Sequence, residues 1–250
     1  MILWTHEHII TLLPAMILMV GFSVLLGWLL RNSTRQVRMI PVQIITVLLL
    51  LLEVGKQALS FQRGYDLYHI PLHFCSLFIF VMPVFSFYRG KYRAAVETIT
   101  AALCTSVFVL MAIYPALIYT DQNVHDFFGD FFSFHTVVFH NLVVLLCMLI
   151  FCLGLYEPRR QDRRVVSLFI VIYGVVAATA AQLLKTNFNN FYSCNIPPLE
   201  SLRLLVQGAL GYWPAQIMYI LIVIVMDVGF VLLSLWLAGL ACRLRKKVAA

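Results

Sequence analysis

The sequence predicts an all-α integral membrane protein, a bundle of about seven transmembrane helices that forms a single domain over residues 1–250. The first observation behind this prediction is composition: the chain is 62% hydrophobic and 12% charged, with a mean hydropathy of +0.91. A soluble domain carries about 25% charged residues, because its core needs a polar shell. The other two observations are the length of the apolar stretches and the charge of the loops between them.

Each apolar stretch is long enough to cross a bilayer, which takes about 20 mostly apolar residues in a helix. The seven predicted spans are residues 9–30, 39–60, 70–88, 94–119, 134–155, 165–185 and 213–241. The last span is long, and a tilted helix can accommodate its length. Between the sixth and seventh spans, the segment 186–214 is rich in Asn and Pro and predicts a loop with a short interfacial helix near residues 199–207.

The charge of the connecting loops alternates along the chain. Lys and Arg gather in segments 31–38, 88–93, 157–164 and 242–247, whereas segment 120–130 has neither and contains three aspartates. Since basic loops stay on the cytoplasmic side, this alternation predicts that the N-terminus is outside and the C-terminus is cytoplasmic. It also accounts for the net charge of +7, so we expect no nucleic-acid partner.

Reactive side chains gather in the outer half of this predicted bundle. All seven histidines fall there, and the segment YHIPLHFCSLFIF (68–80) combines two of them with Cys75. Cys75 lies about five residues into the third span and His140 about six residues into the fifth, so at ~1.5 Å per residue both reach a similar depth. A cysteine–histidine pair drawn from two helices requires this arrangement.

A cysteine and a histidine at one depth point to acyl transfer. A thiol attacks an acyl carbonyl only as the thiolate, and a neighbouring imidazole can remove its proton. We therefore assign Cys75 as the candidate nucleophile and His140 as the candidate base, with His73 and His135 as competing or supporting residues. The pair would act on membrane phospholipids as an acyltransferase or a hydrolase, through a thioester. The competing explanation for Cys75 is ordinary core packing.

Three charged side chains inside the predicted spans support a different function. Glu53 and Lys56 are three positions apart on the second span and can pair on one helix face, and Asp227 lies near the middle of the seventh span. Charged groups within a membrane mark substrate and ion pathways. A transporter or receptor for a small ligand that uses these three residues is therefore an alternative, as is a purely structural Glu53–Lys56 pair.

Four histidines suggest a further alternative, a metal or haem site. His69 and His73 are four positions apart, which places them on one face if the segment is helical, and His135 and His140 would complete the ligand set. Pro71 lies between the first two histidines and disturbs helical spacing. We therefore expect no bound metal and no other cofactor.

Three motifs occur in an order that matches a known family: PLHFC at 71–75, FHTVVFHNLVVLL at 134–146 and KTNFNNFYSCNIPPLESLRLLVQGALGYWP at 185–214. Together they resemble the YwaF-type integral membrane proteins of bacteria, which are related to transmembrane protein 164. The resemblance covers most of the chain from the second span onward. It implies a multi-pass protein of the bacterial plasma membrane.

The resemblance also implies an activity. The animal member is regarded as a cysteine/histidine acyltransferase that moves a fatty acyl chain from a phospholipid to a lysophospholipid. Carried over to the matching positions, the nucleophile is Cys75 and the base is His140, with His135 as the competing choice. The asparagines of the 186–214 loop match the family loop, where they are expected to support the loop or contact the lipid headgroup. The candidate substrate-binding residues are Asn187, Asn189, Asn190, Glu53, Lys56 and Asp227.

Overall fold

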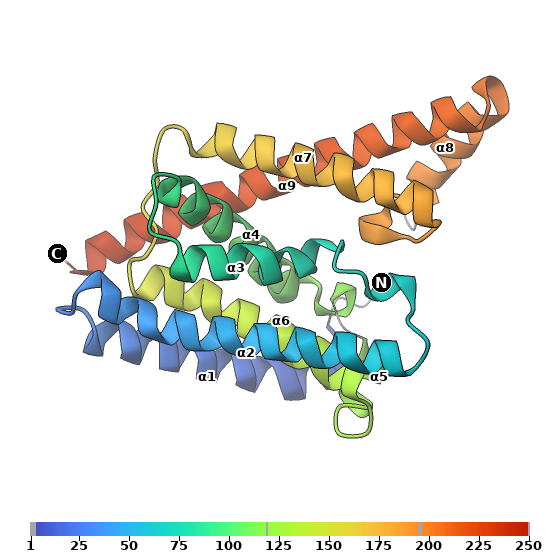
Figure 1. Cartoon of the computed structure of the whole chain (residues 1–250). Coiled ribbons are helices and arrows are strands. Elements are labelled where there is room, and N and C mark those ends of the chain that lie inside the picture. Colours follow the sequence, from blue (N-terminus) through green and yellow to red (C-terminus); the bar gives the residue numbers. More distant parts are fainter. Residues whose placement is uncertain (1–3, 119, 195–196, 250) are drawn as a thin grey trace.

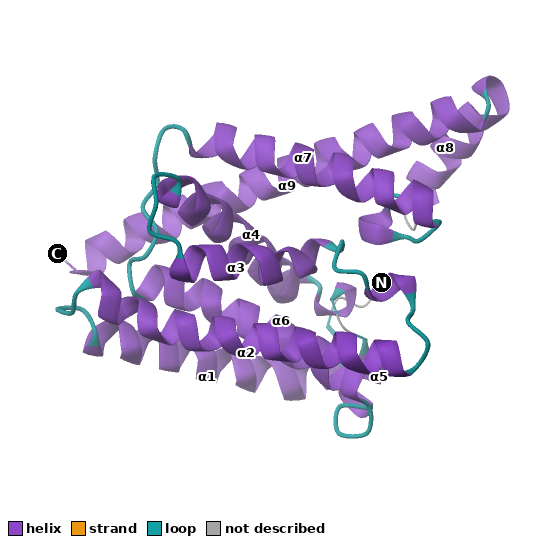
Figure 2. Ribbon diagram, viewed as in Figure 1, coloured by secondary structure: helices purple, strands orange, loops and turns teal. Residues whose placement is uncertain are grey.

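The computed structural model describes residues 4–118, 120–194 and 197–249. This part of the chain consists of helices joined by loops and contains no strand (Figures 1 and 2), as predicted for an all-α protein. The α-helices are α1 (His6–Leu29), α2 (Arg35–Gln62), α3 (Phe78–Phe87), α4 (Arg93–Ile113), α5 (Asp121–His125), α6 (Phe131–Cys152), α7 (Asp162–Leu184), α8 (Pro197–Leu210) and α9 (Tyr212–Ala249).

Six of the helices in these residues are long and apolar enough to cross a membrane, namely α1, α2, α4, α6, α7 and α9. Each covers one predicted span, which confirms a multi-pass integral membrane protein. The fourth span ends earlier than predicted, at Ile113. Pro115 begins a separate 3₁₀ turn there (η3, Pro115–Leu117), and the residue before a proline is pushed out of the helical region.

The third predicted span, residues 70–88, differs from the others. It is preceded by the 3₁₀ turn Leu67–His69 (η1), begins irregularly, and becomes helical only through the turn Phe74–Leu77 (η2) and α3. The apolar helical part, Phe74–Phe87, is roughly 21 Å long at ~1.5 Å per residue, which is short of the ~30 Å hydrocarbon core of a bilayer. A seventh full-length helix is therefore replaced by a short apolar helix with an irregular entrance.

Pro71 explains this entrance. The residue before a proline favours an extended backbone, and Ile70 has φ −58° and ψ 131°. His73 is extended as well, with φ −74° and ψ 153°. One expectation is corrected as a result: Cys75 lies in the first turn of the helical segment rather than about five residues along a helix. The irregular backbone between His69 and His73 agrees with the disturbed spacing that Pro71 predicts.

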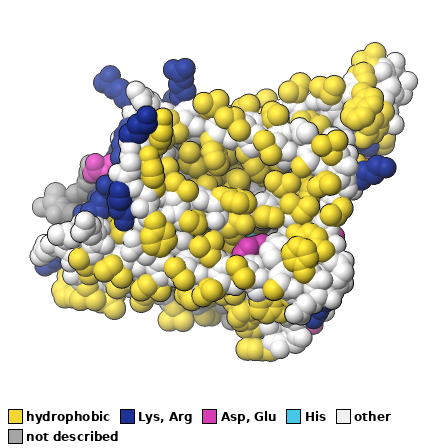
Figure 3. All heavy atoms as spheres, in the orientation of Figure 1, with side chains coloured by type: hydrophobic (Ala, Val, Ile, Leu, Met, Phe, Trp, Pro, Cys, Tyr) yellow, Lys and Arg dark blue, Asp and Glu magenta, His cyan; other side chains and the backbone are white. Residues whose placement is uncertain are grey.

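The long helices run back and forth between two ends of the bundle (Figure 1). The loops 30–34, 88–92 and 153–161 and the end of α9 lie together at one end, which we call the basic end; Figure 3 shows most of the visible Lys and Arg there. The start of α1 and the segments 63–77 and 120–130 lie at the other, which we call the histidine end. The basic loops thus share one end, as their alternation along the chain requires.

Helix α4 is the central helix of the bundle. It packs against α3, α6, α7 and α9 and presents a buried run that includes Ala101, Ala102 and Cys104. Small side chains of this kind let membrane helices approach closely. A short helix is present where one was predicted, near residues 199–207: it is α8, which packs against α9. In Figure 1 this pair projects from the histidine end.

Candidate functional site

A buried carboxylate, Glu53 of α2, organises the polar groups at the histidine end. Glu53 is 6% exposed. The predicted pair is present, because Lys56 Nζ lies 2.7 Å from Glu53 Oε1. Gln57 Nε2 also donates to Oε1, at 2.7 Å. A carboxylate this deeply buried needs partners, because an unpaired charge in an apolar interior is costly.

His135 of α6 is the partner that connects two helices. Its Nε2 lies 3.2 Å from Glu53 Oε2. The ring also stacks against Phe139, with centroids 5.3 Å apart. His135 therefore contacts the Glu53 carboxylate through Nε2.

His140, further along α6, has a different environment. The side chain is 7% exposed, and its Nδ1 donates a hydrogen bond to the carbonyl oxygen of Thr136 at 2.7 Å. A ring nitrogen that donates to a carbonyl must carry the proton, so the neutral ring keeps its lone pair on Nε2. Within the described residues, no hydrogen bond to Nε2 is found, so this nitrogen remains able to accept a proton.

Cys75 lies in the 3₁₀ turn η2 and is half-buried. Over the part of the chain that the structure describes, no hydrogen bond joins Cys75 to His140. Cys75 and His140 therefore lie on separate elements, η2 and α6, without the hydrogen bond that the predicted pair would need.

The two histidines of the 68–75 entrance stabilise the backbone around Cys75. His73 Nε2 lies 3.1 Å from the Tyr68 carbonyl oxygen, and its ring packs against Tyr68 and Phe188. His69 Nδ1 lies 2.7 Å from Ser60 Oγ. Both side chains support the chain on either side of Pro71.

Gln57 connects this entrance to the buried carboxylate, and sequence reasoning did not identify it. Its Nε2 donates to the His69 carbonyl at 2.8 Å as well as to Glu53, and its Oε1 accepts from the Tyr65 hydroxyl at 2.8 Å. The sequence did contain a signal for this contact, because Gln57 is four positions after Glu53 and a helix places two such side chains on one face.

The four histidines proposed as metal or haem ligands have separate partners. Those partners are Ser60 for His69, Tyr68 for His73, Glu53 for His135 and Thr136 for His140. Among the described residues, no group of three or more His, Cys, Asp or Glu side chains is placed to hold a metal ion. The described part of the chain therefore shows no ligand set for that alternative.

The asparagine loop is built by its own side chains. Asn187 Oδ1 accepts from the backbone N–H groups of Tyr192 and Ser193, both at 3.1 Å. Asn189 and Asn190 have positive φ values of 46° and 61°, a region that asparagine tolerates better than most residues. These contacts and backbone angles define the shape of the loop.

Asp227 of α9 is held by this loop. Asn189 Nδ2 donates to its Oδ2 at 2.8 Å. No hydrogen bond or ion pair of the described residues connects Asp227 with the Glu53–Lys56 pair. The three charges proposed as one transport or receptor site are thus divided between two separate polar clusters.

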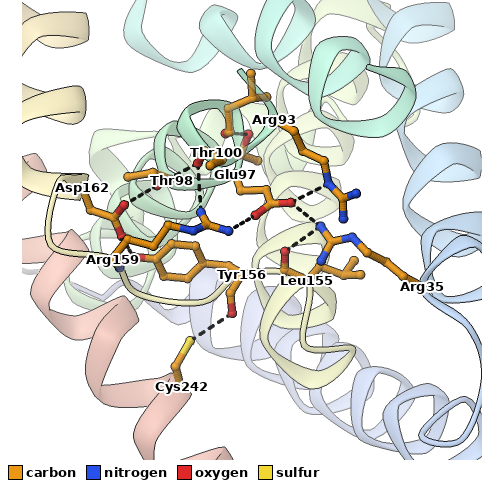
Figure 4. A network of polar contacts seen from close by, with 12 residues as sticks. Arg35, Arg93, Glu97, Thr98, Thr100, Leu155, Tyr156, Arg159, Asp162 and Cys242 are labelled. Atoms are coloured by element: carbon orange, nitrogen blue, oxygen red, sulfur yellow. Dashed lines mark hydrogen bonds and ion pairs between the residues drawn. The ribbon is translucent and has the colours of Figure 1, made fainter. Parts of the chain in front are cut away.

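Another polar network, separate from the Glu53 and Asp227 clusters, lies at the basic end (Figure 4). Glu97 of α4, 4% exposed, accepts hydrogen bonds from three guanidinium groups, those of Arg35 at 2.5 Å, Arg93 at 2.9 Å and Arg159 at 2.6 Å. Sequence reasoning missed Glu97, although Arg93 and Glu97 have the i, i+4 spacing of a helical ion pair. This carboxylate joins α2, α4 and the loop after α6.

Asp162 forms the other half of that network. It is 5% exposed and accepts hydrogen bonds from the hydroxyls of Thr98 and Tyr156, both at 2.7 Å, as Figure 4 shows. The backbone N–H of Arg159 donates to it at 2.8 Å. Asp162 therefore anchors the start of α7 to α4.

Comparison with known protein families gave a match over most of the chain. A family model described as the TMEM164 family matches residues 3–234, a range that contains Glu53, Cys75, His135 and His140. Comparison with curated proteins gave no match, and comparison with solved structures gave none either. Because the family match extends over most of the chain, from α1 into α9, this protein belongs to the TMEM164 family.

Proposed function

We propose that this protein is a membrane-embedded phospholipid acyltransferase, or a lipid hydrolase, of the bacterial plasma membrane. Cys75 is the nucleophile and His140 the base. The observation that carries the proposal is the tautomer of His140, whose Nδ1–H donates to the Thr136 carbonyl and leaves the lone pair on Nε2. Family membership supports the same chemistry, since the resemblance of the motifs implies a cysteine/histidine acyltransferase.

Lys56 supports this reaction electrostatically. Its ammonium group is the cation of the buried pair with Glu53 at the histidine end. A positive charge beside a thiol favours the thiolate, and the same charge stabilises the oxyanion that develops on an attacked carbonyl. Glu53 holds the ammonium at 2.7 Å, so the charge stays oriented inside the bundle.

The reaction has two steps, each with its protons balanced. First, His140 Nε2 takes the thiol proton while Cys75 Sγ attacks the ester carbonyl of a phospholipid. The ester C–O bond breaks, the departing lysophospholipid oxygen takes the proton, and the acyl chain stays on sulfur as a thioester. Second, His140 takes a proton from an incoming hydroxyl, which attacks the thioester, and the proton returns to sulfur.

The incoming hydroxyl decides the outcome of the second step. A lysophospholipid hydroxyl yields a new phospholipid, so the protein acts as a transferase, whereas water yields a free fatty acid. Cys75 lies in the first turn of the short helical segment at the histidine end, and the proposal puts this turn at the level of the ester carbonyl, between headgroup and acyl chain. A lipid can therefore present its ester without leaving the bilayer.

Binding of the substrate has to bring Cys75 and His140 together. Catalytic hydrogen bonds are often long in unliganded enzymes and tighten in the substrate complex. The entrance before Cys75 is the element suited to this adjustment, because its extended residues Ile70 and His73 are not locked into the hydrogen-bond ladder of a long helix.

The test uses the full chain in vesicles that contain a phospholipid with a labelled acyl chain and an unlabelled lysophospholipid. We expect label to appear in the phospholipid formed from the lysophospholipid, and on the protein as an adduct that hydroxylamine releases. Cys75→Ala should lose both signals. Cys152→Ala, which changes another half-buried cysteine near the basic end, should keep both. An undiminished adduct in Cys75→Ala would refute the thioester on Cys75.

A further inference from the structure

A pocket of about 480 Å³ opens beside Glu97 at the basic end. Its lining includes Arg35 and Arg38 from the start of α2, Lys91 from the loop before α4, Arg93 from the start of α4, and Arg159 from the loop after α6. The volume lies within the range of ordinary small-ligand pockets, about 300–1,000 Å³. The pocket is distant from the proposed acyl-transfer site, at the opposite end of the bundle, and its function does not depend on that proposal.

The lining carries more positive than negative charge. Its five cations face two carboxylates, those of Glu97 and Glu157. Glu97 contacts three guanidinium groups at 2.5 to 2.9 Å, so its single negative charge is shared among three positive charges. A surplus of concentrated positive charge favours an anionic ligand.

Two of the lining cations are not neutralised by a carboxylate of the described residues. Arg38 donates from Nη1 to the Leu153 carbonyl at 2.7 Å, while its Nε–H is buried without an acceptor. The Lys91 ammonium lies over the Tyr92 ring, 4.9 Å from its centroid. These donors retain hydrogen-bonding capacity that an oxygen-rich anion can use.

Two helices also direct their N-termini toward this end. Helix α2 starts at Arg35 and α4 at Arg93, and neither has a side-chain cap hydrogen bond nor an acidic residue in its first turn. Uncapped backbone N–H groups at a helix N-terminus attract negative charge. Their effect adds to that of the arginines around the same pocket.

We infer that this pocket binds a phosphate group, and that the phosphate belongs to the headgroup of an anionic phospholipid in the adjacent leaflet. Phosphate matches the planar guanidinium forks of several arginines. The membrane source follows from position: the lining cations lie in the first turns of membrane-spanning helices and in the loops beside them, where lipid headgroups lie. Basic pockets between transmembrane helices on the cytoplasmic side bind such headgroups.

The experiment measures lipid binding to the full chain in a detergent that lacks phosphate. Native mass spectrometry counts bound phosphatidylglycerol and phosphatidylcholine, and a parallel titration follows the Tm with each lipid and with inorganic phosphate. We expect phosphatidylglycerol to bind and to raise the Tm at lower concentration than phosphatidylcholine. Stabilisation by inorganic phosphate that equals that of phosphatidylglycerol would overturn the lipid assignment.

Variants separate the pocket from general basic charge. Arg38→Gln and Lys91→Gln each remove a cation that makes no ion pair with Glu97, and their combination should weaken phosphatidylglycerol binding at least about tenfold. The matched control is Arg163→Gln with Arg164→Gln, which removes two exposed charges of α7 outside the pocket and should leave binding unchanged. Equal affinity of the two double variants for phosphatidylglycerol would overturn the proposal. If Arg38→Gln fails to fold, Lys91→Gln alone is compared with the control instead.

Discussion

His140 Nδ1 lies 2.7 Å from the carbonyl oxygen of Thr136, one helical turn earlier on α6. This backbone contact fixes the ring so that Nε2 is the nitrogen without a proton. His135, on the same helix, has Nε2 occupied by Glu53 instead. Two histidines of one helix therefore have different chemical capacities, which a comparison of variants can measure.

For the base, we expect His140→Gln to lower acyl exchange by at least about 100-fold, in the range that loss of a general base produces. His135→Gln should retain most of the activity, because it removes a contact to Glu53 rather than the base. The measurement is initial exchange rate in vesicles, with Tm as the control for folding. An inactive, folded His135→Gln beside an active His140→Gln would reverse the assignment.

For the buried pair, Glu53→Gln leaves Lys56 without its carboxylate in the bundle. Breaking a buried ion pair from one side costs about 3–5 kcal/mol, so a marked loss of Tm is expected. The double variant Glu53→Gln with Lys56→Met should be more stable than Glu53→Gln alone, because no uncompensated charge remains. If the two substitutions are additive, the ion pair does not stabilise the bundle in this way.

For the contact between α1 and α6, Gly27 is the informative position. A Cβ added there would lie 3.0 Å from the Cys152 carbonyl oxygen, so Gly27→Ala should destabilise the protein by about 1–3 kcal/mol. Gly21→Ala is the matched control on the same helix, since its Cβ would meet nothing within 4 Å, and it should be neutral or stabilising by up to about 1 kcal/mol. Thermal unfolding of both variants in one detergent checks the difference.

For the asparagine loop, the backbone of Asn189 separates two effects. With φ at 46°, glycine fits the position without strain, whereas a Cβ costs about 1–2 kcal/mol for an ordinary L-residue. Both Asn189→Gly and Asn189→Ala lose the hydrogen bond to Asp227, so Asn189→Ala should be less stable by that amount. Equal stability of the two variants would show that the loop relaxes away from this conformation.

For pH dependence, His69 is the relevant group outside the spanning helices. Burial lowers its pKa below the usual 6.5, and its ring stacks on Phe132 with centroids 4.7 Å apart. The unfolded chain takes up the proton at a higher pH than the folded one, so stability is complete above about pH 6.5 and is lost as pH falls below that value. The Tm of the natural protein should fall more than that of His69→Gln between about pH 7.5 and pH 5.

Local properties of the chain determine a large part of this molecule. The length of an apolar stretch and the number of basic residues in a loop depend on neighbouring residues alone, and they suffice to identify six long spans and the loops that share one end. The Glu53–Lys56 contact was equally accessible, because helix geometry places residues three apart on one face. The entrance at Pro71 was read only in part: its disturbance of helical spacing was expected, but the shortened third helix was not.

Contacts between helices were decided only by the tertiary structure. The approach of His135 to Glu53, the hydrogen bond from Asn189 to Asp227 and the convergence of three arginines on Glu97 each join separate elements. Similar depth along two helices does not specify how each helix is rotated about its axis, so the sequence could align Cys75 with His140 but not bring them into contact. Rotation follows from how all the helices pack together, and no single stretch of sequence encodes that packing.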